Sequence, residues 1–305
     1  MTVYSHNQAL PAGQPGTALA LGCFDGVHIG HQAVIKAAGQ YAKQNGLRLA
    51  VFTFLPQAKP NAAGSALFTE PQKHQELEAL GVEYCFQPPF ESFHNLTPRQ
   101  FFSDMLLGQY RAKALFCGHN FAFGAGRAGN TELLQTFCSQ SGVHLQLVET
   151  ALYKGSPVSS SRIRRALANG NIPAVNAMLG RPYQITYPVQ HGQQVGTKLG
   201  FPTINQIYPA GMQAPKDGVY ITQTELNGKL WPSTTGYGSR PTLNGVGATC
   251  ETFIPGFSGD LYGKQVTVRF FEYVSPMVKF ATLQDLAAAV QAWAKQAVEY
   301  FEAPQ

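Results

Sequence analysis

The chain has 305 residues, of which 44% are hydrophobic and 13% charged, and its formal net charge is +5. This length favours two domains, and so mild a charge lacks the dense basic face typical of nucleic-acid-binding proteins. The five cysteines form no CxxC pair, and neither a signal peptide nor a membrane span is recognisable. We therefore expect a cytoplasmic protein with small-molecule partners and no nucleic-acid or membrane partner, and we leave a homo-oligomer open.

The first part of the chain alternates between apolar runs and helical patterns. Residues 17–23 predict a buried strand, 31–44 a helix and 47–54 a second strand, which together make a βαβ unit. The pattern continues with helices over 71–80 and 98–107 and strands over 82–86, 114–117 and 145–148. This order predicts an α/β domain built on a Rossmann-like, doubly wound parallel sheet.

The character of the sequence changes near residue 182. Two short helices are expected before it, over 161–168 and 173–179. Strands are expected after it, over 187–191, 218–226, 229–235, 249–254 and 265–273, followed by one helix over 283–301. Asn227-Gly228 is a strong hairpin signal. We predict domains 1–182 and 183–305, the second a small antiparallel β-barrel with a terminal helix.

The ten residues 22–31 (GCFDGVHIGH) lie where the first strand passes into a helix. Ligands of open parallel sheets bind at the carboxyl ends of the strands, and a helix N-terminus offers backbone N–H groups to an anion. His28 and His31 are three residues apart, so both can point at one phosphate while charge develops on it. Two alternatives are a zinc site completed by Cys23 or His119, and histidines that only cap or pack the helix.

A basic segment, SSSRIRR at residues 159–165, coincides with the start of another predicted helix. Serine is a good helix N-cap, but cations in the first turn oppose the helix dipole. Phosphate oxygens at the same place would offset that repulsion, because arginine holds them in a fixed geometry. A solvated basic face is the alternative, and Arg165 fits it best.

A glycine-spaced loop at residues 192–200 leads into a short run that includes Thr203 and Asn205. If this run is extended, both side chains lie on one face of a strand. A hydroxyl and an amide placed in this way can ligate Mg²⁺ with phosphates and waters, while the loop covers the phosphates of ATP. A simple turn followed by a strand is the alternative.

Longer motifs indicate a family. HIGH at residues 28–31 resembles class I aminoacyl-tRNA synthetases, but no KMSKS loop accompanies it. The order and spacing of the motifs resemble instead the bacterial bifunctional riboflavin kinase/FMN adenylyltransferase (FAD synthetase) family over essentially the whole chain. The matching segments are GCFDGVHIGH at 22–31, GHNFAFG at 118–124, SSSRIRRAL at 159–167, LGRPY at 179–183, GTKLGFPTIN at 196–205, RPT at 240–242, CET at 250–252 and DLYG at 260–263.

For the first domain, the resemblance implies joining of FMN to the AMP part of ATP with release of pyrophosphate. The resemblance implies three catalytic residues, His28, His31 and Arg162, of which the two histidines would stabilise the transferring α-phosphate. The residues implied to bind ATP and flavin are Gly22, Phe24, Asp25, Gly26, Gly30, Gly118, Asn120, Phe123, Gly124, Ser159, Ser160 and Ser161.

For the second domain, the resemblance implies phosphorylation of riboflavin by ATP. Glu251 would be the general base for the ribityl 5′-hydroxyl; an exposed strand residue or ion-pair partner is the alternative. Thr203 and Asn205 would ligate Mg²⁺, and the substrate-binding residues would be Gly196, Lys198, Gly200, Pro202, Asn205 and Arg240. Both reactions would use Mg²⁺ and ATP, with riboflavin, FMN and FAD as substrates and products.

The chain departs from this family's pattern in places that hold flavin. Residues 56–58 read Pro-Gln-Ala where the family commonly has a PHP-like segment, and Ile204 stands at an alanine position. Phe253 and Gly256 replace more typical polar residues, and residues 273–280 lack an arginine and an acidic residue. The departures in the second domain motivate one alternative, an adenylyltransferase with weak or lost kinase activity. A non-catalytic flavin-binding regulator on the same fold is a second alternative.

Overall fold

The structure, a computed structural model, describes residues 1–5, 8–54, 65–192, 196, 200–238 and 248–303. The chain divides into two compact units, Met1–Ser160 and Ser161–Gln305. Helices α5 (Ser160–Ala168) and α6 (Ile172–Leu179), which the predicted boundary at residue 182 assigns to the first domain, therefore lie in the second unit apart from Ser160. Each unit has its own sheet, and the two are described separately.

The first unit is built on a parallel sheet of six described strands in the order β1-β4-β3-β2-β5-β6. From β2 the chain moves outward through β3 to β4, returns to β5 beside β2, and then moves outward in the other direction to β6, so the switch point lies between β2 and β5. The strands are β1 (Thr2–Tyr4), β2 (Thr17–Leu21), β3 (Arg48–Phe52), β4 (Tyr84–Phe86), β5 (Ala112–Gly118) and β6 (His144–Val148).

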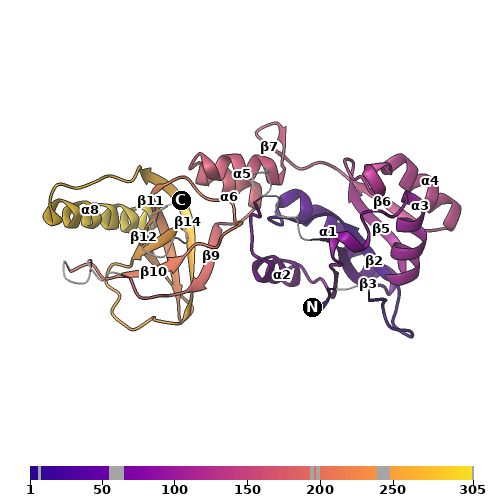
Figure 1. Cartoon of the computed structure of the whole chain (residues 1–305), viewed down its shortest axis with the longest axis horizontal. Helices are drawn as coiled ribbons and strands as arrows, with labels where there is room; N and C mark the ends of the chain where they lie inside the picture. Colours follow the sequence, from indigo (N-terminus) through magenta and orange to yellow (C-terminus); the bar gives the residue numbers. More distant parts are fainter. Residues whose placement is uncertain (6–7, 55–64, 193–195, 197–199, 239–247, 304–305) are drawn as a thin grey trace. The chain divides into compact units, whose positions relative to one another are not determined.

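Helices cover both faces of this sheet (Figure 1). On one face, α1 (Ile29–Asn45) buries Val34, Ile35, Ala38 and Ala42 at helical spacing, beside Leu77 of α2 (Glu70–Ala79). The other face packs against α3 (Pro98–Gln100), the π-helical segment η2 (Phe101–Gln109) that continues it, and α4 (Thr131–Ser141). The predicted doubly wound α/β domain is confirmed.

The second unit contains a curled antiparallel sheet of six described strands in the order β10-β13-β12-β11-β14-β9. A bridge between Gln190 and Asn205 brings the end beyond β9 back to β10. The terminal helix α8 (Leu283–Glu302) lies alongside β11 and β12 (Figure 1). The strands are β9 (Tyr183–Pro188), β10 (Thr203–Ile207), β11 (Gly218–Leu226), β12 (Lys229–Gly238), β13 (Thr249–Phe253) and β14 (Gln265–Ser275).

The barrel-like sheet with its terminal helix agrees with the prediction. The hairpin expected at Asn227-Gly228 joins β11 to β12, and both residues have positive φ angles, 51° and 75°. The structure adds elements that the sequence did not predict: β1, α4, the 3₁₀ segments η1 (Phe90–Ser92) and η3 (Ala125–Arg127), and the hairpin β7 (Leu152–Tyr153) and β8 (Ser156–Pro157).

No helix in the part of the chain that the structure describes is both long enough and apolar enough to cross a membrane.

Candidate active sites

The turn between β2 and α1 has an unusual backbone. Phe24 and Val27 have φ angles of 50° and 39°, which side-chain-bearing residues rarely adopt, and Gly26 has φ 78°. The rings and methyl groups of Phe24 and Val27 are buried in the core under α1, so packing holds the turn in this conformation. Strained turns of this kind are concentrated at functional sites.

His28 is the N-cap of α1. Its Nδ1 accepts a hydrogen bond from the backbone N–H of His31 at 3.3 Å. In the neutral ring Nδ1 therefore carries no proton, and Nε2–H is the remaining donor. Gly30 leaves room for the ring, because a Cβ there would lie 3.2 Å from Cε1 of His28. The cap thus fixes both the position and the tautomer of the imidazole.

His31 stacks on His28, with ring centroids 3.6 Å apart and an interplanar angle of 16°. The rings of Phe24 and His31 are also in T-shaped contact, with centroids 5.3 Å apart. Nδ1 of His31 is buried and has no hydrogen-bond partner among the described residues. Burial holds the pKa of His31 well below its usual range, and the charges of His28 and Lys73 lower it further.

A hydrogen bond joins the serine-rich segment to the histidine turn. Oγ of Ser160 donates to the carbonyl oxygen of Asp25 at 2.9 Å. The Asp25 carboxylate, itself buried, accepts the backbone N–H of Leu67 at 2.9 Å. Ser159 is exposed, and Ser161 and Arg162 follow on α5 in the second unit.

The loop after β5 lies at the same edge of the sheet, because β5 is the parallel neighbour of β2 and Gly118 is its last residue. Asn120 is exposed there. Phe123 is buried and its ring lies 5.6 Å from that of Phe101, so it packs in the core behind the loop. Gly124 has φ 75°.

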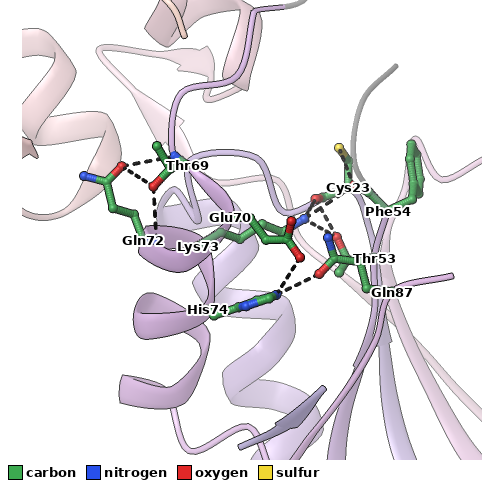
Figure 2. Close-up of polar contacts among 9 residues, drawn as sticks. All are labelled: Cys23, Thr53, Phe54, Thr69, Glu70, Gln72, Lys73, His74 and Gln87. Carbon is green, nitrogen blue, oxygen red and sulfur yellow. Dashed lines mark hydrogen bonds and ion pairs between the residues drawn. The ribbon is translucent and has the colours of Figure 1, made fainter. Parts of the chain in front are cut away.

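Sequence reasoning missed Lys73 at this site. It lies on α2, is 5% exposed, and its ammonium donates to the carbonyl oxygen of Cys23 at 2.8 Å (Figure 2). A single lysine inside a helical pattern normally faces solvent, so nothing in the local sequence marks it.

A second site lies in a cavity of about 1030 Å³ within the second unit. Thr203 and Asn205 of β10 and Glu251 of β13 all line it, and Asn205 and Glu251 are directly paired across the two strands. The next residue, Thr252, faces the other way, where its hydroxyl hydrogen-bonds that of Thr235 at 2.9 Å. Strand alternation therefore aims the carboxylate into the cavity.

Glycine and apolar side chains complete the cavity wall. A Cβ on Gly192 would lie 2.4 Å from Nδ2 of Asn205, so only glycine permits this approach. Phe253, one of the departures from the family's pattern, packs with Phe201 against α8. Gly196 also lines the cavity, and Pro202 and Gly200 are exposed beside it.

Some predicted residues are not described. Lys198, Arg240 and residues 56–58 lie outside the described part of the chain. Among the residues that are described, no cluster of three or more His, Cys, Asp or Glu side chains is arranged to hold a metal ion.

A parallel sheet with a histidine pair at its switch point, and a barrel with a glutamate, Glu251, facing its cavity, together define a two-domain nucleotide-dependent transferase. Two family profiles match the chain, one over the part with the parallel sheet and one over the part with the barrel. One, described as FAD synthetase, matches residues 10–162, and one described as riboflavin kinase matches residues 179–301.

Curated relatives cover nearly the whole chain. The bifunctional riboflavin kinase/FMN adenylyltransferase of Escherichia coli K12 is 33% identical over 95% of this chain and 94% of its own length. The Bacillus subtilis protein of the same name is 30% identical over 94% and 93%. The chain therefore belongs to the bifunctional riboflavin kinase/FMN adenylyltransferase family.

A solved structure shares the complete two-domain fold. It is titled as a macrolide-efflux protein from Streptococcus pneumoniae, and it superposes with a TM-score of 0.85 over 95% of this chain and 96% of that chain, at 26% identity.

Proposed function

We propose that the second unit converts riboflavin and ATP to FMN and ADP, and that the first unit converts FMN and ATP to FAD and pyrophosphate. The family profiles for these activities cover the two halves of the chain, and the named relatives combine both. Two observations carry the proposal: Thr203, Asn205 and Glu251 converge on one cavity of the second unit, and a histidine pair lies at the switch point of the first unit's sheet.

In the kinase step, Glu251 acts as the general base. The ribityl 5′-oxygen forms a bond to the γ-phosphorus while the bond to the β–γ bridging oxygen breaks and ADP leaves. The hydroxyl proton passes to the Glu251 carboxylate, which lies on the cavity wall next to Asn205 of the neighbouring strand. The apolar wall of Phe201, Phe253 and Trp293 suits the flat, largely apolar flavin ring.

The donor set in this cavity fits Mg²⁺. Thr203 and Asn205 present a hydroxyl and an amide oxygen on one strand face, and such hard oxygen donors share Mg²⁺ with phosphates and waters. When bound, the ion neutralises charge on the phosphate oxygens.

In the adenylyl step, an oxygen of the FMN phosphate attacks the α-phosphorus of ATP and pyrophosphate departs. Nε2–H of His28 is the donor on the other side of a capped, stacked imidazole, suited to the charge that develops there. The buried Nδ1 of His31 has no partner among the described residues, which a bound substrate would remedy. The loop 118–124, the serines 159–161 and Arg162 supply further phosphate and nucleotide contacts in this proposal.

One assay tests the whole proposal: incubation with riboflavin, ATP and Mg²⁺, followed by separation of the flavins over time. FMN is expected first and FAD after it. If FAD forms only when FMN is supplied, the protein is an adenylyltransferase without kinase activity. If it binds flavin without converting it, the protein is a regulator. Cytoplasmic location, the absence of nucleic-acid partners and the oligomeric state stay predictions.

A further inference from the structure

A lysine is buried next to the histidine turn. Lys73 is 5% exposed, although lysine is almost never fully buried without partners. Its side chain extends from α2 to the carboxyl ends of β2 and β3 (Figure 2). This is the edge of the sheet at which the His28 turn begins. The mechanism proposed above leaves this group without a task.

The ammonium is held by three oxygen atoms from two strand ends. It donates to the carbonyl oxygen of Cys23 at 2.8 Å, to Oγ1 of Thr53 at 2.5 Å and to the carbonyl oxygen of Phe54 at 3.4 Å. The Thr53 hydroxyl in turn donates to the Cys23 carbonyl at 2.7 Å. Lys73 therefore ties the residues that follow β2 to those that follow β3, just before the left-handed residue Phe24.

All three acceptors are neutral oxygens. Among the described residues no ion pair includes Lys73; the nearby Glu70 pairs instead with His74 at 3.9 Å. Burial lowers the pKa of Lys73, whereas the thiols of Cys23 and Cys85 and the carboxylates of Asp25 and Glu70 oppose that shift. Burial therefore disfavours the protonated form of Lys73, and the charge of its ammonium is poorly screened because water is excluded.

That charge acts on the histidine pair. Burial, His28 and Lys73, in that order, hold the pKa of His31 well below its usual range. Two imidazoles stacked at 3.6 Å repel each other if both are charged, so the capped arrangement requires a neutral partner.

We propose that Lys73 is a positioning residue for adenylyl transfer, which fixes the ends of β2 and β3 under the histidine turn and keeps His31 in its neutral form. This inference rests on the adenylyltransferase function proposed for the first unit. Lys73 affects the reaction indirectly, by holding the histidine turn in place and by keeping His31 neutral.

The first test is the titration of His31 in the substrate-free full-length chain, followed by NMR of the histidine rings and assigned with His31→Gln. The wild type is expected to titrate well below the ordinary midpoint of about 6.5. In Lys73→Met, which removes a positive charge, the midpoint is expected to move upward. If His31 of the wild type titrates with an ordinary midpoint, the proposal is overturned, even if Lys73→Met does not fold.

The second test is the pH profile of kcat/KM for FAD formation, since its acid limb reports ionisations of the free enzyme. Lys73→Met is expected to shift this limb to higher pH and to lower kcat/KM on the order of 10-fold at neutral pH, because small misplacements are catalytically costly. The matched control is Lys36→Met, which removes an exposed lysine from α1 of the same unit. FMN formation by the second unit is expected to be unchanged in both variants.

The outcomes separate this inference from the function on which it rests. Lys73→Met could lower stability and still keep the wild-type titration midpoint of His31 and the wild-type acid limb of the pH profile. That result would show that Lys73 is only structural, and the proposal would fail. A wild type that makes no FAD refutes the proposed function instead, and the NMR titration remains readable because it needs no substrate.

Discussion

At the scale of single residues, the register of the barrel decides which side chain can act as a base. Glu251 faces the cavity opposite Asn205, whereas Thr252 faces inward and bonds Thr235. Side chains alternate along a strand, so a slip of one residue would replace the carboxylate by a hydroxyl. The hydroxyl of Thr222 hydrogen-bonds those of Ser233 and Thr235 at 3.0 and 2.9 Å. The bond from Thr235 to Thr252 connects this buried network to β13, so the network opposes such a slip.

Glu251→Gln tests this assignment. The amide cannot accept the proton of the 5′-hydroxyl, so FMN formation is expected to fall roughly 10²–10⁴-fold, while added FMN is still converted to FAD. Both rates are measured by separating the flavins. Glu272→Gln, an exposed change on β14, is the matched control. Kinase turnover near the parental rate would remove Glu251 from the mechanism.

Single residues of the sites were predictable to different degrees. The shared face of Thr203 and Asn205 follows from strand alternation alone, and the structure places both on one cavity. The pairing of Asn205 with Glu251 joins distant parts of the chain, for which local sequence carries no signal. The burial of Lys73 also depends on tertiary packing, because its acceptors belong to other elements.

At the scale of elements, α1 and His28 depend on each other. The sequence left three interpretations of His28 open: a phosphate donor, a zinc ligand, and a residue that caps or packs the helix. The structure shows the cap, which uses Nδ1. The donor role proposed above belongs to the other ring nitrogen, Nε2. One imidazole can therefore serve the helix with one nitrogen and the substrate with the other.

Two substitutions separate these roles. His28→Asn keeps a good N-cap, whereas His28→Ala removes it and is expected to lower the stability of the first unit by about 1 kcal/mol. Both variants lose the imidazole, so both are expected to reduce FAD formation on the order of 10²-fold. Urea unfolding and the FAD assay measure the two effects. Full FAD synthesis by His28→Asn would show that His28 is only a cap.

The elements themselves were predicted best where periodicity is strong. The βαβ unit of β2, α1 and β3 follows from apolar spacing. The strand β1 has three residues and pairs with the distant β4, so it lacks a local pattern. α4 was missed although Asn130 caps its start and Gly142 ends it in the left-handed region.

At the scale of the whole molecule, the change in sequence character and the division of the structure fall at different places. The pattern changes near residue 182, where helices give way to strands, but the units divide after Ser160. The reason lies in α6: Asn176 donates to the carbonyl oxygen of Phe270 at 2.8 Å and accepts the N–H of Tyr183 at 2.7 Å. The composition of a segment indicates whether it forms a helix or a strand, but it does not indicate which part of the molecule the segment packs against.

The five free cysteines give a test of both cores at once. Burial raises the pKa of Cys85 and of Cys117 to about 12 and that of Cys138 to about 11, and it raises the pKa of Cys250 in the second unit. A raised thiol pKa means that the reactive thiolate is scarce near neutral pH. Cys23 differs because it is half-buried in the histidine turn.

Brief alkylation with iodoacetamide near pH 8, read by mass spectrometry of peptides, is expected to modify Cys23 first and to spare the other four until denaturant is added. Raising the pH toward 11 is expected to increase labelling of Cys138 before Cys85 and Cys117, following the order of their pKa values. ATP is expected to slow modification of Cys23, because the nucleotide would occupy the adjacent turn. Rapid labelling of Cys117 or Cys250 in the native chain would contradict the packing of the corresponding unit, since both side chains are fully buried.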